Sequence, residues 1–308
     1  MRIVLTGSSG SIGRAIHAQL AKRHVVIGLD RVPAPTTDVV CDLLDAGRVR
    51  ATLVGADAVV HVAALHAPQV DRAPPEEFRR VNVEGTRTLA GAAIAVGVSR
   101  FVYTSTTALY GSAIGTAGGH AAWIDEAVAP RPLNIYHETK LRAEQLLQRY
   151  GEAGALAVTI LRMSRCFPEP PPVRTVFRLH RGIDARDVAS AHERAVELFG
   201  RGGVKLFVIS APTPFEPRDC ERLVHDAPAV LRARAPALVA EFKRRNWALP
   251  NRIDRVYDSR LAQRELGWRA LYGFDAVLAE VDAAEPASPQ RGPLADLAPP
   301  GPQPASPA

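Results

Sequence analysis

The sequence contains no run of about 18 apolar residues, and its first expected strand begins at residue 2 with no charged segment followed by an apolar leader before it. These absences argue against a membrane span and a secretory signal, so we expect a cytoplasmic protein. Cysteine is rare as well. Cys41, Cys166 and Cys220 lie far apart and lack the paired spacing of a zinc site, which predicts reduced thiols and no metal centre.

Lysine is scarce too, since only four of the 38 basic residues are lysines and the rest are arginines. The arginines are interleaved with 32 acidic residues, so the net charge of +6 is spread along the chain. This distribution does not predict a nucleic-acid-binding surface. A hydrophobic content of 47% is sufficient for a buried core, and the length allows one large or two modest globular domains.

The first 13 residues predict a strand, a tight glycine turn and the start of a helix. An apolar run over 3–5 is followed by Gly7, Gly10 and Gly13, and apolar residues then recur at helical spacing. A helix whose first turn lacks bulky side chains offers free backbone N–H groups and the positive end of its dipole to a pyrophosphate. The stretch favours a dinucleotide, and a glycine turn without a ligand is the alternative.

The next apolar run, over 25–30, ends in Asp30. In a strand, helix, strand unit this residue lies at the carboxyl end of the second strand, where a carboxylate accepts both hydroxyls of the adenosine ribose. A carboxylate also repels a 2′-phosphate, so the sequence favours NAD over NADP. The neighbouring Arg31 would soften this preference.

Apolar runs and helical segments alternate through most of the chain. We expect further strands at 38–43, 57–64, 100–104 and 207–210, and helices at 75–96, at 136–150 and within 218–245. This alternation predicts an α/β fold with a Rossmann-type, doubly wound parallel sheet and a small C-terminal substrate-binding region.

The expected organisation has three parts. Residues 1–165 form the NAD-binding Rossmann domain with the catalytic residues, and residues 166–284 form a substrate-binding region interleaved with the last sheet strands. Residues 285–308 are a tail rich in proline and alanine, which we expect to be disordered because it cannot bury enough apolar surface.

A series of short motifs resembles the extended short-chain dehydrogenase/reductases, the NAD-dependent epimerase/dehydratase family. In chain order the motifs are Thr6–Gly13, Asp30, Asp42-Leu43, His61–Ala64, Asn82–Thr86, Thr104–Thr107, Tyr136–Lys140 and Leu266–Trp268. The cofactor-binding residues implied by this resemblance are Gly7, Ser9, Gly10, Ser11, Ile12, Gly13, Asp30, Arg31, Asp42, Leu43, Ala63, Ala64, Asn82, Thr104, Tyr136 and Lys140.

Tyr136 and Lys140 are one turn apart in an expected helix, so they share one face. A free tyrosine titrates near pH ~10, and a nearby ammonium favours its phenolate. By resemblance, Tyr136 is the acid/base on the substrate hydroxyl, and Lys140 lowers its pKa and holds the nicotinamide ribose. Thr106 would then orient the reacting oxygen, with Ser105 as the fallback.

Substrate recognition departs from the larger members of the family. The segment over 165–187 is short and resembles that of uronate dehydrogenases, in which an arginine matched here by Arg174 meets the sugar-acid carboxylate. Arg165 stands where an epimerase usually has an Asn. Thr107-Ala108 replace the Asp-Glu pair of nucleotide-sugar 4,6-dehydratases, which disfavours dehydration. The expected substrate-binding residues are Ser105, Thr106, Arg165 and Arg174.

The leading hypothesis is an NAD-dependent oxidoreductase or epimerase with reversible hydride transfer at a hydroxyl-bearing carbon of a sugar or nucleotide sugar. An alternative is uronate-dehydrogenase-like oxidation of a free sugar acid. An alternative of another class is a non-catalytic NAD(H)-binding sensor or scaffold. The resemblance also implies a homodimer packed through the helices at 75–96 and 136–150, with no nucleic acid or membrane partner.

Overall fold

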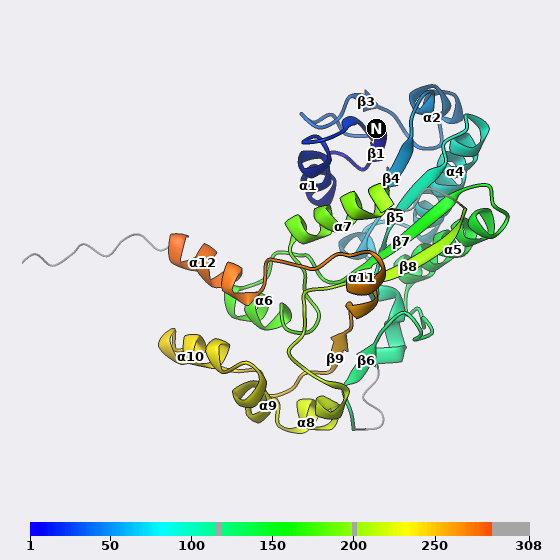
Figure 1. Cartoon of the computed structure of the whole chain (residues 1–308). Coiled ribbons are helices and arrows are strands. Elements are labelled where there is room, and N and C mark those ends of the chain that lie inside the picture. Colours follow the sequence, from blue (N-terminus) through cyan, green and yellow to red (C-terminus); the bar gives the residue numbers. More distant parts are fainter. Residues whose placement is uncertain (115–118, 199–201, 285–308) are drawn as a thin grey trace, which may run out of the picture.

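The computed structural model describes residues 1–114, 119–198 and 202–284, so the expected disordered tail lies outside the described residues. A seven-stranded parallel sheet forms the centre, in the order β3-β2-β1-β4-β5-β7-β8 (Figure 1). Its strands are β1 (Arg2–Thr6), β2 (Val25–Asp30), β3 (Val39–Val40), β4 (Ala58–His61), β5 (Arg100–Thr106), β7 (Ala157–Met163) and β8 (Gly203–Ile209). The strand order reverses between β1 and β4, which confirms the predicted Rossmann-type topology.

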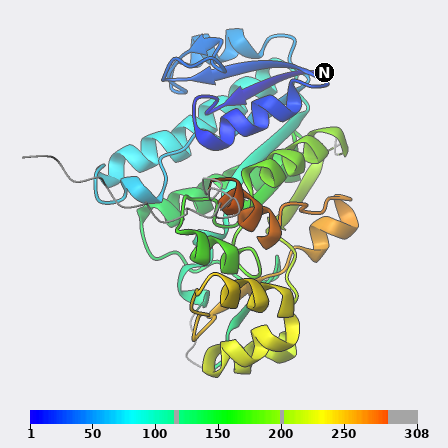
Figure 2. The same ribbon diagram turned by 90° about the vertical axis from the view of Figure 1, so that its left-hand side faces the viewer.

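Helices cover both faces of this sheet (Figures 1 and 2). One face carries α1 (Ser11–Leu20) and α7 (Ala185–Leu198), and the other carries α2 (Ala46–Leu53), α4 (Gly85–Ala95) and α5 (Ile135–Glu152). Successive strand residues serve the two cores in turn: Ile3 and Leu5 pack on the α1 and α7 side, and Val4 packs on the other. This follows from the alternation of side chains along a strand.

A smaller part of the molecule lies beside the sheet, at the bottom of Figure 1. It contains α6 (Pro171–Phe177), α8 (Cys220–His225), α9 (Ala227–Arg234), α10 (Pro236–Arg244), α12 (Phe274–Ala284) and a two-stranded sheet of β6 (Ala122–Ile124) and β9 (Arg255–Tyr257). Its own core includes Leu223, Leu231 and Phe242. The chain passes between the two parts more than once. After α6 it returns to the seven-stranded sheet for α7 and β8, and after β9 it returns again for α11 (Arg260–Glu265).

Short helical turns complete the described chain. They are η1 (Ala67–Gln69), α3 (Pro75–Phe78), η2 (Arg79–Glu84), η3 (Thr107–Ile114) and η4 (Pro217–Asp219). The expected helix over 75–96 is therefore built from α3, η2 and α4, and η2 is a π-helical turn in its middle. None of the helices in the described ranges is long and apolar enough to cross a membrane.

Four strand predictions differ from the structure in extent. β5 continues two residues past the expected end at 104, to Thr106. The strand expected over 38–43 is only Val39–Val40, because the chain turns where the Asp42 Oδ1 accepts the Leu44 N–H at 2.9 Å. β4 ends at His61 and not at residue 64, because the Thr6 hydroxyl accepts the next two N–H groups. β8 begins at Gly203, earlier than expected, since it pairs with β7 along its whole length.

Candidate active site

A cavity of about 600 Å³ opens at the carboxyl ends of the central strands, beside the point where the strand order reverses. Ligands of open α/β sheets bind at this place. Of the residues predicted to bind cofactor or substrate, or to act in catalysis, all line this cavity except Asn82 and Arg174. Residues from distant motifs therefore meet around one space.

The glycine turn forms one end of the cavity. Gly7 has a φ of +73°, and a Cβ on Gly13 would lie 1.9 Å from the Gly7 carbonyl oxygen, so both positions require glycine. The N-cap of α1 is Gly10, and no side chain caps this helix end. The first N–H groups of a helix have no partner within it, so this end fits the oxygens of a pyrophosphate.

Asp30 is held rigidly at the end of β2. Its Oδ2 accepts the Ser9 N–H at 3.0 Å and its Oδ1 accepts the Val32 N–H at 3.1 Å. The neighbouring Arg31 also lines the cavity, and its Nη1 lies 3.6 Å from the Glu77 Oε1. The carboxylate, and not the guanidinium, is the fixed charge at this end, which fits a ribose with free hydroxyls.

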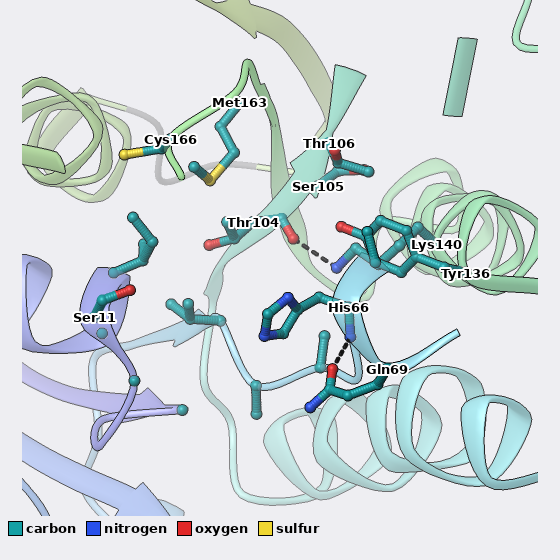
Figure 3. A pocket seen from close by; sticks show the side chains of 18 of the residues that line it. Ser11, His66, Gln69, Thr104, Ser105, Thr106, Tyr136, Lys140, Met163 and Cys166 are labelled. Carbon is teal, nitrogen blue, oxygen red and sulfur yellow. Dashed lines mark hydrogen bonds between the residues drawn. The ribbon is translucent and has the colours of Figure 1, made fainter. Parts of the chain in front are cut away.

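The predicted catalytic residues lie on one side of the cavity, where Thr106 ends β5 and Tyr136 and Lys140 come from the first turns of α5 (Figure 3). Asn134 caps α5 by accepting the N–H of His137 at 3.0 Å. The Lys140 Nζ donates to the Thr104 carbonyl oxygen at 2.7 Å, which fixes the side chain beneath the cavity. Tyr136 is 9% exposed.

Burial dominates the electrostatics of this pair. It raises the pKa of Tyr136 to about 12, and the hydrogen bond with Thr106 only partly opposes this. It lowers the pKa of Lys140 to about 7, although the Glu144 carboxylate favours the ammonium. In the free protein at neutral pH, Tyr136 is therefore a protonated phenol.

Asn82 was expected to contact the cofactor, but it is fully buried and does not line the cavity. Its Oδ1 accepts the Leu65 N–H at 2.8 Å, and its Nδ2 donates to the Leu65 carbonyl at 2.9 Å and to the Thr139 Oγ1 at 3.0 Å. Thr139 immediately precedes Lys140 in α5. Asn82 thus ties the π-helical turn and the loop after β4 to the helix that carries Tyr136 and Lys140.

Arg174 also lies outside the cavity lining. Its Nη2 donates to the Glu280 Oε2 at 2.7 Å, and Arg186 binds the other oxygen of the same carboxylate at 3.0 Å. The side chain therefore joins α6 to α12, because α12 supplies a carboxylate close to it. Arg165 does line the cavity, where it forms an ion pair with Glu169.

Two arginines of the cavity wall were not singled out from the sequence. Arg181 and Arg255 share one carboxylate, that of Asp254, whose Oδ1 is 3.7 Å from the Arg181 Nη1 and 3.0 Å from the Arg255 Nε. Their side chains are 23% and 22% exposed. One sequence pattern could have pointed to Arg255: it lies two residues before Tyr257, so the two side chains share a face of the strand β9. In the structure both residues line the cavity.

Comparison with known proteins gives one family match. The profile of the NAD dependent epimerase/dehydratase family matches residues 3–205, a range that contains the glycine turn, Tyr136 and Lys140 and ends within β8.

Three of the curated relatives that match this chain each cover about half of it. A 3-beta-hydroxysteroid dehydrogenase of Mycolicibacterium neoaurum is 34% identical over 174 residues, 52% of this chain and 46% of that protein. An NAD-dependent glucose-6-phosphate dehydrogenase of Haloferax volcanii is 29% identical, over 55% of this chain and 70% of that protein. A uronate dehydrogenase of Agrobacterium fabrum is 29% identical, over 55% of this chain and 63% of that protein. The chain thus spans less than half the length of the first.

Among solved structures, a short-chain dehydrogenase/reductase superfamily protein from Agrobacterium tumefaciens with bound NAD superimposes with a TM-score of 0.68. It is 23% identical, and the superposition covers 92% of this chain and 96% of that one. At this identity the likeness concerns the fold.

Proposed function

Because this chain belongs to the NAD dependent epimerase/dehydratase family, we propose that it is an NAD-dependent oxidoreductase or epimerase. The reaction is reversible hydride transfer at a hydroxyl-bearing carbon of a sugar or nucleotide sugar. One observation carries the proposal: Thr106, Tyr136 and Lys140 line the same cavity as the glycine turn. A non-catalytic NAD(H) sensor or scaffold has no need of an acid/base tyrosine at that place.

Each residue has a role that follows from its place in the cavity. The α1 N-terminus holds the pyrophosphate, Asp30 holds the adenosine ribose and Lys140 holds the nicotinamide ribose, and NAD when bound supplies the hydride-accepting carbon. The Tyr136 hydroxyl exchanges a proton with the substrate hydroxyl, and the Thr106 hydroxyl orients that oxygen. A dehydrogenase would release its oxidised product, whereas an epimerase would receive the hydride back on the opposite face of the same carbon.

The proposal favours NAD over NADP. A 2′-phosphate at the end of β2 would meet the fixed carboxylate of Asp30, while the Arg31 guanidinium next to it lies 3.6 Å from the Glu77 carboxylate. The negative charges of the phosphate and of the Asp30 carboxylate repel each other, so NADP is expected to bind less tightly than NAD.

A second candidate, oxidation of a free sugar acid, is supported by the arginines of the cavity wall. Arg181 and Arg255 have one carboxylate between them, and burial, followed by the charge of Arg255, lowers the pKa of Arg181. An excess of positive charge in a three-quarters-buried wall favours a substrate that carries an anionic group. A carboxylate or a phosphate on the sugar provides it.

The direct test incubates purified protein and NAD with sugar acids and with nucleotide hexoses, and follows both NADH and the isomer composition. Net NADH formation with an acid supports a dehydrogenase, and isomerisation without net NADH supports an epimerase. Tight NAD binding without turnover of any hydroxylated substrate would instead support the non-catalytic sensor.

We expect Arg255→Gln to raise the KM for an anionic substrate by about 10- to 100-fold and to change kcat little, because a charge-assisted hydrogen bond contributes about 1.5–3 kcal/mol. Steady-state kinetics on the substrate found in the screen measures both constants. Arg269→Gln is the matched control, since Arg269 is exposed and does not line the cavity. An unchanged KM in Arg255→Gln would contradict the anionic subsite.

We also propose that the protein acts in the cytoplasm and as a homodimer packed through the helices at 75–96 and 136–150, as the resemblance implies. Sedimentation equilibrium with a charge-reversed α5 surface would separate the dimer from a monomer.

A further inference from the structure

Three side chains with metal-binding groups meet at the amino edge of the sheet, opposite the cavity. His24 lies between α1 and β2, and Glu193 and Glu197 lie in the second half of α7, which packs against α1. Helices of a doubly wound fold run against the strands, so the ends of α1 and α7 lie together at this edge. One ligand atom from each of the three residues lies within 4.8 Å of the other two.

The imidazole of His24 is the unusual member of this group. Its side chain is only 8% exposed, and neither ring nitrogen has a hydrogen-bond partner. Buried polar side chains in folded proteins are nearly always hydrogen-bonded. The Nε2 lies 3.6 Å from the Glu197 Oε1, which is long for a hydrogen bond. It is close to the separation of about 3.4 Å between two ligands on a tetrahedral zinc ion.

The two carboxylates are placed to complete a site. Glu193 and Glu197 are one turn apart in α7, so they project from one face of the helix. The Glu193 Oε2 accepts the Gln19 amide at 2.6 Å. Glu197 lies 2.9 Å from Arg23 and 4.0 Å from Arg194.

These partners do not block a cation. A carboxylate that accepts one hydrogen bond still has free lone pairs for an ion. The Arg23 side chain is 65% exposed, so its ion pair is weak and the guanidinium can turn into solvent.

We propose that His24, Glu193 and Glu197 bind a divalent transition-metal ion of the zinc type, with water at the fourth position. An imidazole nitrogen with two carboxylate oxygens suits zinc, whereas magnesium and calcium prefer oxygen ligands alone. The ion fastens the end of the cofactor-binding helix α1 to α7. It lies apart from the catalytic cavity, so its effect is on stability and not on the chemistry there.

The test uses the full-length protein, stripped with a chelator and dialysed. Calorimetric titration with zinc chloride is expected to give one site per chain, and magnesium chloride is expected to give none. At a free zinc concentration of about 100 times Kd, we expect the unfolding temperature to rise by about 4 °C. His24→Gln and Glu197→Gln are each expected to weaken zinc binding by at least about 100-fold.

Glu193→Gln is the ligand variant least expected to misfold. A glutamine has the shape of glutamate and keeps an oxygen that accepts the Gln19 hydrogen bond, but it removes the negative charge that would bind the ion. His120→Gln and Glu152→Gln, at exposed positions elsewhere, are the matched controls and are expected to bind zinc as the wild type does. The visible absorption of bound cobalt(II) gives a second readout, which His24→Gln should lack. Zinc binding that is undiminished in all three ligand variants, or a wild type that binds zinc no better than magnesium, would overturn the proposal.

Discussion

Tyr136→Phe is expected to lower kcat by about 10³-fold on the substrate found in the screen, because general acid–base catalysis contributes about 10²–10⁴-fold. The substitution removes only the hydroxyl, and the ring keeps its packing against Leu65 and Phe78. We therefore expect the Kd for NAD to change by less than about threefold, or about 0.7 kcal/mol. Steady-state kinetics and calorimetric titration with NAD measure the two effects separately.

The pH dependence of the same reaction follows from burial. Oxidation needs Tyr136 without its proton, and burial raises the pKa of Tyr136 to about 12, so kcat/KM for oxidation should rise with pH above neutrality. Reduction needs the protonated phenol, which predominates until the pH approaches 12, so kcat/KM for reduction should change little over the range in which oxidation rises. The rise should be absent in Tyr136→Phe.

Tyr150→Phe is the matched control, because Tyr150 lies at the far end of the same helix and packs against the core. Its kcat and pH profile should equal those of the wild type. If Tyr136→Phe kept its turnover within about tenfold of the wild type, another group would have to be the acid/base.

Gly13→Ala is expected to weaken NAD binding by at least about 100-fold, or about 2.7 kcal/mol. The added methyl group would lie 1.9 Å from the Gly7 carbonyl oxygen and 3.0 Å from the Ser8 Cα, so the turn must open. Opening the turn moves the α1 N-terminus away from the pyrophosphate that it is proposed to hold. Titration calorimetry with NAD measures the affinity, and thermal unfolding checks that the fold is retained.

Gly91→Ala is the control for this substitution. Gly91 lies in α4, and a Cβ there meets nothing within 4 Å. Alanine is the better helix former by about 0.8–1.0 kcal/mol, so this variant should be slightly more stable and should bind NAD normally. Equal NAD affinity in Gly13→Ala and Gly91→Ala would mean that the turn does not hold the cofactor.

The parts of the site that were predicted from the sequence are encoded locally. The motifs are a glycine turn, an acid at the end of a strand and a tyrosine one turn before a lysine. The local structure of each can be predicted from a few neighbouring residues. Parallel strands then bring their ends to one edge, so motifs that are far apart in sequence, such as Asp30 and Tyr136, line one cavity. The topology and the cofactor end of the site could therefore be predicted together.

The substrate end could not be predicted in this way, because its contacts are set by tertiary packing. Arg174 lies in the short segment over 165–187, but its side chain binds Glu280, which is 106 residues away. Arg181 follows α6 and meets the neighbouring residues Asp254 and Arg255 only through tertiary packing, which includes a hydrogen bond from the Tyr257 N–H to the His180 carbonyl oxygen at 2.8 Å. In a chain with so many arginines, no local pattern distinguishes these two from solvated ones.

The π-helical turn over Arg79–Glu84 has a consequence for the phase of its helix. A π turn contains one residue more than an α-helical turn, and one residue corresponds to a rotation of about 100° about the axis. Deleting one residue here would leave a regular helix but would rotate α3 relative to α4. Phe78 would then point away from its contact with Tyr136. The extra residue thus rotates α3 relative to α4 by a fixed angle. As a result Phe78 of α3 packs near Tyr136, while α4 packs against the sheet.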